Sequence, residues 1–360
     1  MPSDESNQPA SENIGKYKAV YSSARDAQGG IPQIVIQQPA NSSGWSWIMT
    51  RVLGAVLVFS LILNMSLVTQ QSALMGDISG PIEKFHNGDK SATNKIAIIR
   101  IETTIMPPYT EKVFDVIKKI DEDDSVKGVI LAIDSPGGLV ADSHEIYHKL
   151  QALAQKKPMY VSMRRLAASG GYYVAMGIGE KGKIYAEPTT WTGSIGVIIP
   201  RYDVSELAKN WGVKADPLTT GPFKDALSPF KPLSEAEREV WSGIMDESYQ
   251  RFVDIIDANR PNMNREQVLE VATGRIFTSQ QAVDKGLVDK IGFLDDAIDA
   301  MKTDHNLGAI KVVKYEFTPT LSSLIFGEAK LEATPNVMET LMNQSVPRAM
   351  YLFSWQTSER

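Results

Sequence analysis

The sequence of 360 residues has no cysteine and only four histidines. Without cysteine the chain forms no disulfide, has no thiolate metal ligand and has no cysteine nucleophile. His144 and His148 are four residues apart in the stretch H-E-I-Y-H, which lacks the further ligands that a zinc site needs. We therefore expect these two residues to be exposed helix histidines, and we predict no metal and no cofactor.

The chain also lacks an excess of basic residues, with 37 Lys and Arg against 43 Asp and Glu and a formal charge of -6. A nucleic-acid partner needs a basic surface that neutralises phosphates, so no nucleic acid is expected. Hydrophobic residues make up 43% and charged residues 22% of the chain. This composition is typical of a globular protein with a buried core, in one large domain or two modest ones.

Hydrophobic periodicity is weak over residues 1–44, which are rich in Ser, Asn, Gln, Pro and Ala. We predict a disordered tail there. Residues 45–69 are then almost continuously apolar, with no charge between Arg51 and Asp77. A cleaved signal peptide would lie nearer the N-terminus, and an all-round apolar helix suits lipid better than a protein core. The prediction is one transmembrane helix, because about 20 apolar residues span a bilayer.

Basic residues indicate the orientation of this helix. Lys16, Lys18, Arg25 and Arg51 precede the apolar run, whereas the first lysine after it is Lys84. Cytoplasmic segments carry the excess of Lys and Arg. We therefore expect a cytoplasmic tail, a linker at 70–94, and everything after the helix on the other side of the membrane.

From residue 95 the pattern alternates between short apolar runs and amphipathic stretches. Strands are predicted at 95–101, 128–134, 158–163, 183–186 and 195–199. Helices are predicted at 109–121, 139–155 and 234–257, with a further helical segment after Asn264. The helix at 234–257 begins with a capping box at Ser234. Alternating strands and helices predict an α/β fold with a largely parallel core.

Two glycine-rich turns follow predicted strands. In Ser135-Pro136-Gly137-Gly138, backbone amides unshielded by side chains could stabilise an oxyanion, or the segment is a tight turn that starts a helix. In Ala168-Ser169-Gly170, the serine could be a nucleophile with the Gly170 amide free for the oxyanion, or an ordinary helix N-cap. Local sequence leaves both alternatives open.

A nucleophilic serine needs a base, and no histidine lies in a triad motif. A lysine becomes a base when burial lowers its pKa. Lys224 is the candidate because Pro222, Phe223 and Leu227 flank it. The alternative is a solvated surface lysine, and the local sequence does not exclude it.

Five motifs in order resemble the signal peptide peptidase A family, in its short form with a single catalytic unit. They are S-P-G-G at 135–138, A-A-S-G-G-Y-Y at 167–173, T-G-S-I-G-V-I at 192–198, G-P-F-K-D-A-L-S-P at 221–229, and a closing group, G-R-I-F-T at 274–278 with Q-A at 281–282 and G-L-V-D at 286–289. The resemblance covers residues 96–301. The stretch after Met176 is a few residues longer than is usual in the family.

The resemblance implies a crotonase-like, Clp protease-like fold, a repeated β-β-α superhelix, in a membrane-anchored serine endopeptidase. Ser169 falls on the nucleophile, Lys224 on the general base and Ser194 on the hydroxyl that orients the lysine. Gly170, with Gly137 or Gly138, falls on the oxyanion hole.

It also implies peptide substrates, namely signal peptide remnants or other membrane-associated peptides, and a ring-shaped homo-oligomer whose neighbours complete one another's sites. The location that the resemblance implies is the bacterial inner membrane, with a single-pass chain and the catalytic domain, residues 95–320, on the extracytoplasmic side. The role of residues 321–360 is open. The alternatives are a catalytically silent membrane scaffold and a crotonase-fold enzyme acting on acyl-CoA thioesters.

Overall fold

The computed structural model describes residues 11–14, 17–20, 35–37, 43–74, 80–317 and 349–353. The chain divides into two compact units, residues 1–77 and 78–360. In the first unit, β1 (Ser11–Ile14), β2 (Tyr17–Val20) and β3 (Val35–Gln37) form a small antiparallel sheet. Most of the tail predicted as disordered lies outside the described residues, so that assignment stays a prediction.

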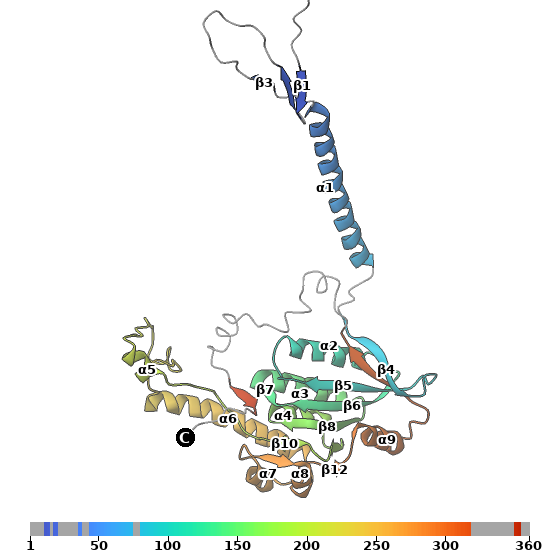
Figure 1. The fold of residues 1–360 in the computed structure, drawn as a ribbon. Helices are drawn as coiled ribbons and strands as arrows, with labels where there is room; N and C mark the ends of the chain where they lie inside the picture. Colours follow the sequence, from blue (N-terminus) through green and yellow to red (C-terminus); the bar gives the residue numbers. More distant parts are fainter. Residues whose placement is uncertain are drawn as a thin grey trace, which may run out of the picture. The chain divides into compact units, whose positions relative to one another are not determined.

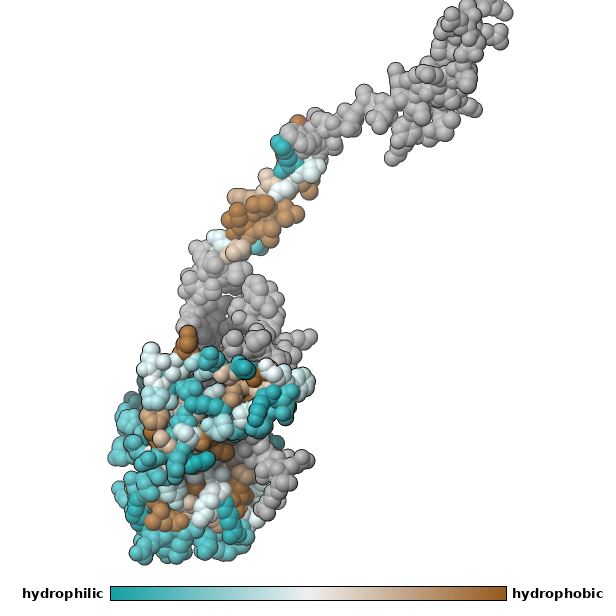
Figure 2. All heavy atoms as spheres, turned by 90° about the vertical axis from the view of Figure 1, so that its left-hand side faces the viewer, coloured by the Kyte–Doolittle hydropathy of each residue, from teal (hydrophilic) through white to brown (hydrophobic). Residues whose placement is uncertain are grey.

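Helix α1 (Ser43–Leu74) is the long apolar element of the first unit. Its 19 residues from Ile48 to Ser66 are apolar enough to cross a membrane, and none of them is buried against other parts of the protein. Figure 2 shows hydrophobic residues on the visible face of this part of the helix. The stretch is about 28 Å long, close to the roughly 30 Å of a hydrocarbon core. It therefore fits a single transmembrane helix.

The second unit is built on a nine-stranded mixed sheet, with the order β11-β10-β8-β6-β5-β13-β4 and the pair β9 and β12 joined through β8. The strands are β4 (Ile82–Gly88), β5 (Lys95–Glu102), β6 (Val126–Ser135), β8 (Met159–Ala168), β9 (Ile184–Ala186), β10 (Trp191–Gly193), β11 (Ile276–Thr278), β12 (Lys290–Ile291) and β13 (Lys311–Glu316). The central strands β5, β6 and β8 are parallel to one another. The antiparallel pairs lie at the two edges, β13 with β4 and β10 with β11.

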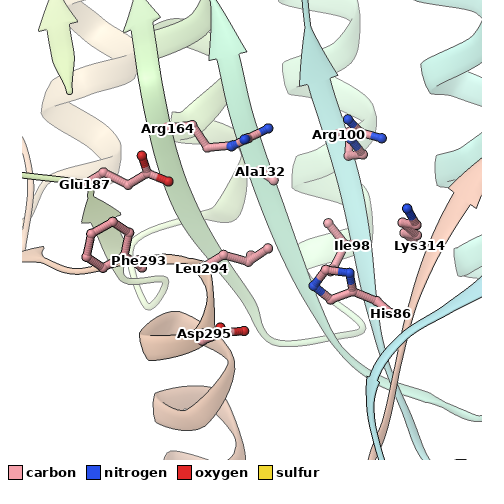
Figure 3. Close-up of a pocket in the computed structure, with 10 residues that line it drawn as sticks. All are labelled: His86, Ile98, Arg100, Ala132, Arg164, Glu187, Phe293, Leu294, Asp295 and Lys314. Atoms are coloured by element: carbon pink, nitrogen blue, oxygen red, sulfur yellow. The ribbon is translucent and has the colours of Figure 1, made fainter. Parts of the chain in front are cut away.

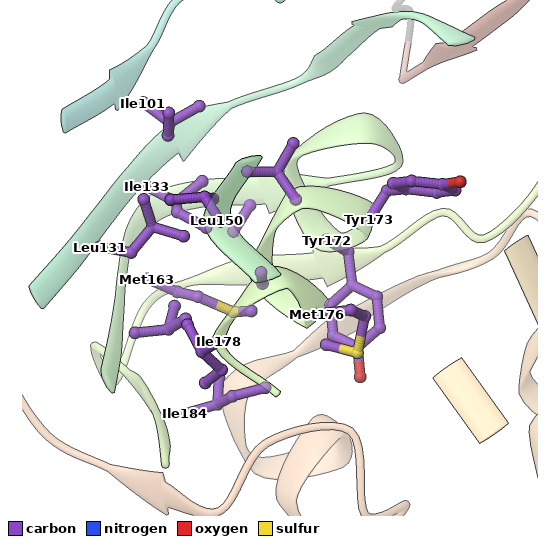
Figure 4. Close-up of a cluster of buried hydrophobic side chains, with 14 of the residues drawn as sticks. Ile101, Leu131, Ile133, Leu150, Met163, Tyr172, Tyr173, Met176, Ile178 and Ile184 are labelled. Atoms are coloured by element: carbon purple, nitrogen blue, oxygen red, sulfur yellow. The ribbon is translucent and has the colours of Figure 1, made fainter. Parts of the chain in front are cut away.

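Both faces of the central strands are buried, as expected of parallel strands that read as continuous apolar runs. One face packs against α2 (Tyr109–Asp121), α3 (Val140–Ala154) and α4 (Gly170–Ala175), in the cluster that Figure 4 shows in part. The other face packs against α9 (Leu294–Asp304). The sheet therefore carries helices on both sides (Figure 1).

The remaining helices are η1 (Met176–Ile178), α5 (Ser205–Asn210), α6 (Glu235–Asn259), α7 (Arg265–Val271) and α8 (Ser279–Asp284). Ser234 and Glu237 form the predicted capping box of α6, which confirms where this helix begins. Phe252 and Ile256 in the second half of α6 are fully buried, whereas Val240 and Ile244 in its first half are 43% and 42% exposed. The first half of α6 extends away from the sheet toward α5 (Figure 1).

The predicted strands and helices of the core are confirmed except at one place. The sequence predicts a strand at 195–199, which is wrong, because the strand there is β10 and it ends at Gly193. The backbone turns there, with positive φ at Gly193 (89°) and Ser194 (50°). Ile198 keeps one isolated bridge, to Met350 in the short strand β14 (Met350–Leu352). Strand β14 pairs with β7 (Gly137–Leu139).

Candidate active site

Ser169 lies between the end of strand β8 and the start of helix α4. It is 1% exposed, and its backbone has φ 54° and ψ -114°. Its amide donates to the Gly193 carbonyl at 2.8 Å, and its carbonyl accepts from the Tyr173 amide at 2.9 Å. These bonds hold a serine in a sparsely populated conformation, of the kind that costs about 1–3 kcal/mol and clusters at functional sites.

The hydroxyl of Ser169 does not cap helix α4. Ser169 occupies the N-cap position, but its side chain accepts no hydrogen bond from the first turn. In the described part of the chain no other hydrogen bond uses this hydroxyl. The ordinary N-cap alternative is therefore wrong, and the hydroxyl is uncommitted.

The three glycines expected to surround the oxyanion come together beside Ser169. A Cβ on Gly170 would lie 3.0 Å from both the Gly137 Cα and the Gly138 nitrogen, and 2.6 Å from the Ser143 hydroxyl. A Cβ on Gly137, which has φ 98°, would lie 2.5 Å from the Gly170 nitrogen. Only glycine fits at both positions, because any side chain would separate the two turns.

The amides of these glycines differ in what they already bind. The Gly137 amide donates to the Ser135 hydroxyl at 3.1 Å. The Gly170 amide is the first of helix α4, so it has no acceptor within that helix. The Gly138 amide belongs to strand β7 and faces strand β14. The Gly170 amide is therefore the best placed of the three to donate to a substrate, whereas the Gly138 amide is paired with strand β14.

Ser194 lies next to Ser169 across a pair of parallel strands. Gly193 of β10 is opposite Ala168 of β8, so the following residues, Ser194 and Ser169, are neighbours. Ser194 is 8% exposed and its amide donates to the Arg275 carbonyl at 2.7 Å. The structure thus brings five of the six predicted site residues into one corner of the sheet.

The sixth, Lys224, lies elsewhere in the chain. It is exposed, and it belongs to a turn between α5 and α6 whose Asp225 binds Lys231, which in turn binds Glu237 at the start of α6. Ser169 is close to the other half of α6, because the nearby Tyr173 ring packs on Phe252 at 4.9 Å. Glu237 and Phe252 are separated by about 22 Å of helix. In the described residues no hydrogen bond joins Lys224 to Ser169.

An aromatic pocket adjoins Gly137, Gly138 and Gly170, which together we call the glycine corner, and no motif in the sequence indicates this pocket. Tyr173 and Phe252 line it, and His144 Nδ1 lies 2.7 Å from the Tyr173 hydroxyl. Burial lowers the pKa of His144, so this ring favours the neutral form. His144 is thus half-buried and hydrogen-bonded, whereas His148 is exposed as expected. Tyr351 of strand β14 fills the pocket, and a three-residue strand far along the chain leaves no periodicity that sequence reasoning could detect.

A separate hollow lies on the face of the sheet that packs against α9. It has a volume of about 400 Å³ and is lined by His86, Ile98, Arg100, Ala132, Arg164, Glu187, Phe293, Leu294, Asp295 and Lys314 (Figure 3). None of the predicted site residues reaches it. Among the described residues there is no cluster of three or more His, Cys, Asp or Glu that could hold a metal ion.

Comparison with known proteins gives matches over the same region. The model of peptidase family S49 matches residues 151–308, and the Clp protease model matches residues 86–192. A protein of Enterococcus faecium that carries the name signal peptide peptidase SppA is 37% identical over 249 residues, covering 66% of this chain and 71% of its own length.

Two further relatives carry the name protease. One from Synechocystis sp. is 40% identical over 207 residues, covering 58% of this chain and 73% of its own length. One from Methanocaldococcus jannaschii is 30% identical over 268 residues, covering 72% and 85%. The mixed sheet and its flanking helices are accordingly a Clp protease-like α/β fold. These matches show that the chain belongs to peptidase family S49, the signal peptide peptidase A family of serine-type peptidases.

Proposed function

We propose that the protein is a membrane-anchored serine endopeptidase in which Ser169 is the nucleophile and Lys224 is the general base. Its substrates are residual signal peptides or other membrane-associated peptides. The observation that carries the proposal is the state of Ser169. Its backbone is held at φ 54° beside three glycines, and its hydroxyl takes part in no hydrogen bond within the described residues.

The proposed reaction is acyl transfer. Neutral Lys224 takes the proton of Ser169, whose oxygen attacks the scissile carbonyl. The Gly138 and Gly170 amides stabilise the oxyanion, each donor being worth about 3–4 kcal/mol. Protonated Lys224 then gives its proton to the leaving amine, and water hydrolyses the ester by the reverse sequence.

We infer that Lys224 reaches Ser169 of a neighbouring copy in a ring. The segment from Tyr202 to Ile244, which carries Lys224, exposes an unusual number of large apolar side chains. They are Tyr202, Leu207, Trp211, Val213, Leu218, Phe223, Phe230, Val240 and Ile244, with Trp211 79% and Leu218 100% exposed. Hydrophobic residues show on this side of the protein in Figure 2. Apolar patches of this kind mark protein interfaces.

Docking of this segment on a second copy would remove water from the amine of Lys224. Loss of water is the condition under which a lysine works as a base at neutral pH. Ser194, which neighbours Ser169, would orient the incoming amine. A head-to-tail contact of this kind repeats around a closed ring, so every copy gives a lysine to one neighbour and receives one from the other.

The apolar helix α1 supports the membrane anchor. Its 19-residue candidate span supports an anchor of this kind, and the lysines and arginines before it favour a cytoplasmic tail with the catalytic unit on the extracytoplasmic side of a bacterial inner membrane. Peptides left in the bilayer after secretion would then be available to the ring.

The test compares Ser169→Ala and Lys224→Ala with Lys214→Ala, an exposed lysine on the same segment. We expect peptide cleavage to be lost in the first two variants and kept in the third. A serine-reactive probe should label Ser169 in the wild-type ring. Full activity of Ser169→Ala would refute the proposal, and peptide binding without turnover by the wild type would favour a silent scaffold.

A further inference from the structure

The hollow on the α9 face of the sheet has no role in the proposed peptidase reaction. Its volume of about 400 Å³ is within the range of about 300–1,000 Å³ that is typical of pockets for small molecules. Helix α9 covers the earlier part of the central strands, around Ile96 and Ile130. The hollow lies beside the start of this helix, over the later part of the same strands, with β4 and β13 at its edge (Figure 3).

The charged side chains of the hollow are separated by sign. Figure 3 shows Glu187 beside Phe293 on one side of the hollow, which we call the acidic end. Arg100 and Lys314 lie on the opposite side, which we call the basic end. Arg164 lies between the two ends. A ligand that spans the hollow therefore meets negative charge at one end and positive charge at the other.

The basic end carries more positive charge than its own partners neutralise. Arg100 and Arg164 share one carboxylate, that of Glu102, which lies 3.5 Å from Arg164 Nη1. Lys314 likewise shares the carboxylate that it binds with Lys84. Each of these carboxylates neutralises only one of its two cations. A further carboxylate, brought by a ligand, would therefore find unpaired positive charge at this end.

The acidic end has the opposite imbalance. Among the residues that the structure describes, neither Glu187 nor Asp295 takes part in an ion pair. Asp295 is in the first turn of α9, where the helix dipole favours a carboxylate without any ligand, so Glu187 is the stronger indication. Phe293 beside it is 54% exposed, and the face of an aromatic ring attracts a cation. This end therefore suits an ammonium group.

The strand order gives the length of a ligand that reaches both ends. Arg100 is in β5, Glu187 directly follows β9, and β5, β6, β8 and β9 are neighbours in this order. Three strand spacings of about 4.8 Å separate the two backbones by about 14 Å. An extended peptide covers about 3.3–3.6 Å per residue. Because the side chains reach into the hollow, a peptide of three or four residues spans it.

We propose that the hollow binds short peptides of three or four residues whose two termini are both free. The ammonium group lies at Glu187 and Phe293. The carboxylate lies at Arg100 and Lys314, and Arg164 donates to the peptide carbonyls between them. Short peptides with free termini are what the proposed peptidase would release. That origin rests on the proposed function, whereas the binding itself does not.

Binding is measured by titration calorimetry with full-length Ser169→Ala protein in detergent, so that the peptides stay uncut. The probes are tetra-alanine, N-acetyl-tetra-alanine, which lacks the ammonium group, and tetra-alanine amide, which lacks the carboxylate. Tetra-alanine should bind about three- to tenfold more tightly than either blocked form, because each block removes one charged contact at a partly exposed site. Dialanine, which is too short to reach both ends, should bind at least about threefold more weakly than tetra-alanine. Equal affinity for tetra-alanine and either blocked form, or for tetra-alanine and dialanine, would overturn the inference.

Two variants of this protein show whether the peptide occupies the hollow. Glu187→Gln should weaken the binding of tetra-alanine about three- to tenfold and leave that of N-acetyl-tetra-alanine unchanged, because this probe has no ammonium group. Arg100→Gln should weaken tetra-alanine to a similar extent and leave the amide unchanged. The matched control is Glu180→Gln, which changes an exposed carboxylate on the turn before β9 and should bind every probe as its parent does. Unchanged binding of tetra-alanine by Glu187→Gln and Arg100→Gln, or no binding of any probe at millimolar concentration, would refute the site in the hollow and leave the proposed function standing.

Discussion

Replacement of Ser169 by glycine should make the protein more stable while it removes activity. The backbone at Ser169 has φ 54° and ψ -114°, a region that glycine enters easily and other residues rarely occupy. Relief of this strain is worth about 1–3 kcal/mol. Glycine also gains freedom in the unfolded chain, which costs about 0.5–1 kcal/mol. The difference favours Ser169→Gly over Ser169→Ala by up to about 2.5 kcal/mol.

The assay is denaturant unfolding of the full-length variants in detergent, with midpoints compared at equal slope. Ser169→Ala is the proper reference because it also lacks the hydroxyl but keeps the strain. Ser162 provides the control, since it is a buried strand residue of β8 whose hydroxyl has no hydrogen-bond partner among the described residues. At this position the glycine variant, Ser162→Gly, should be less stable than Ser162→Ala, which is the reverse of the order expected at Ser169. A Ser169→Gly variant less stable than Ser169→Ala would show that the backbone is not strained.

Three further predictions concern the frame of the site. Gly170→Ala should abolish cleavage, checked by peptide hydrolysis, because its Cβ would lie 3.0 Å from the Gly138 nitrogen. Arg260→Met should lower the free energy of unfolding by about 3–5 kcal/mol, measured by denaturant unfolding, because Arg260 is 2% exposed and loses both its ion pair with Asp289 and its bonds to the Gly286 carbonyl. Lys231 and then Ser234 hold the pKa of Glu237 at about 2, below its ordinary 4.5. The stability that Glu237 contributes should thus be present above pH 4.5 and lost as pH falls toward 2, a loss that Glu237→Gln should not show in a thermal melt series.

Much of the catalytic frame is predictable from sequence because it depends on local chemistry. The apolar runs of β5 and β6 read as buried parallel strands, and Ser234 with Glu237 marks the start of α6. The glycines of both turns are required by close backbone approach, which makes them visible as motifs. That the Ser169 side chain does not cap helix α4, however, is shown only by the observed side-chain geometry.

Other features depend on contacts between distant segments. The stretch 195–199 is apolar like a strand, but positive φ at Gly193 and Ser194 turns the chain out of the sheet. Val240 and Ile244 keep helical spacing with Phe252, and sequence does not indicate that only Phe252 is buried within the chain. The pairing of β14 with β7 joins residues more than 200 positions apart, and no local pattern encodes such a pairing.

Complementation between two inactive variants tests the shared Ser169 and Lys224 site most directly. Ser169→Ala and Lys224→Ala are co-expressed, and the mixed oligomer is assayed for peptide cleavage beside each variant alone. If each site takes its serine from one copy and its lysine from the next, random mixing should restore about a quarter of wild-type activity. A mixed oligomer as inactive as its parents would contradict the account.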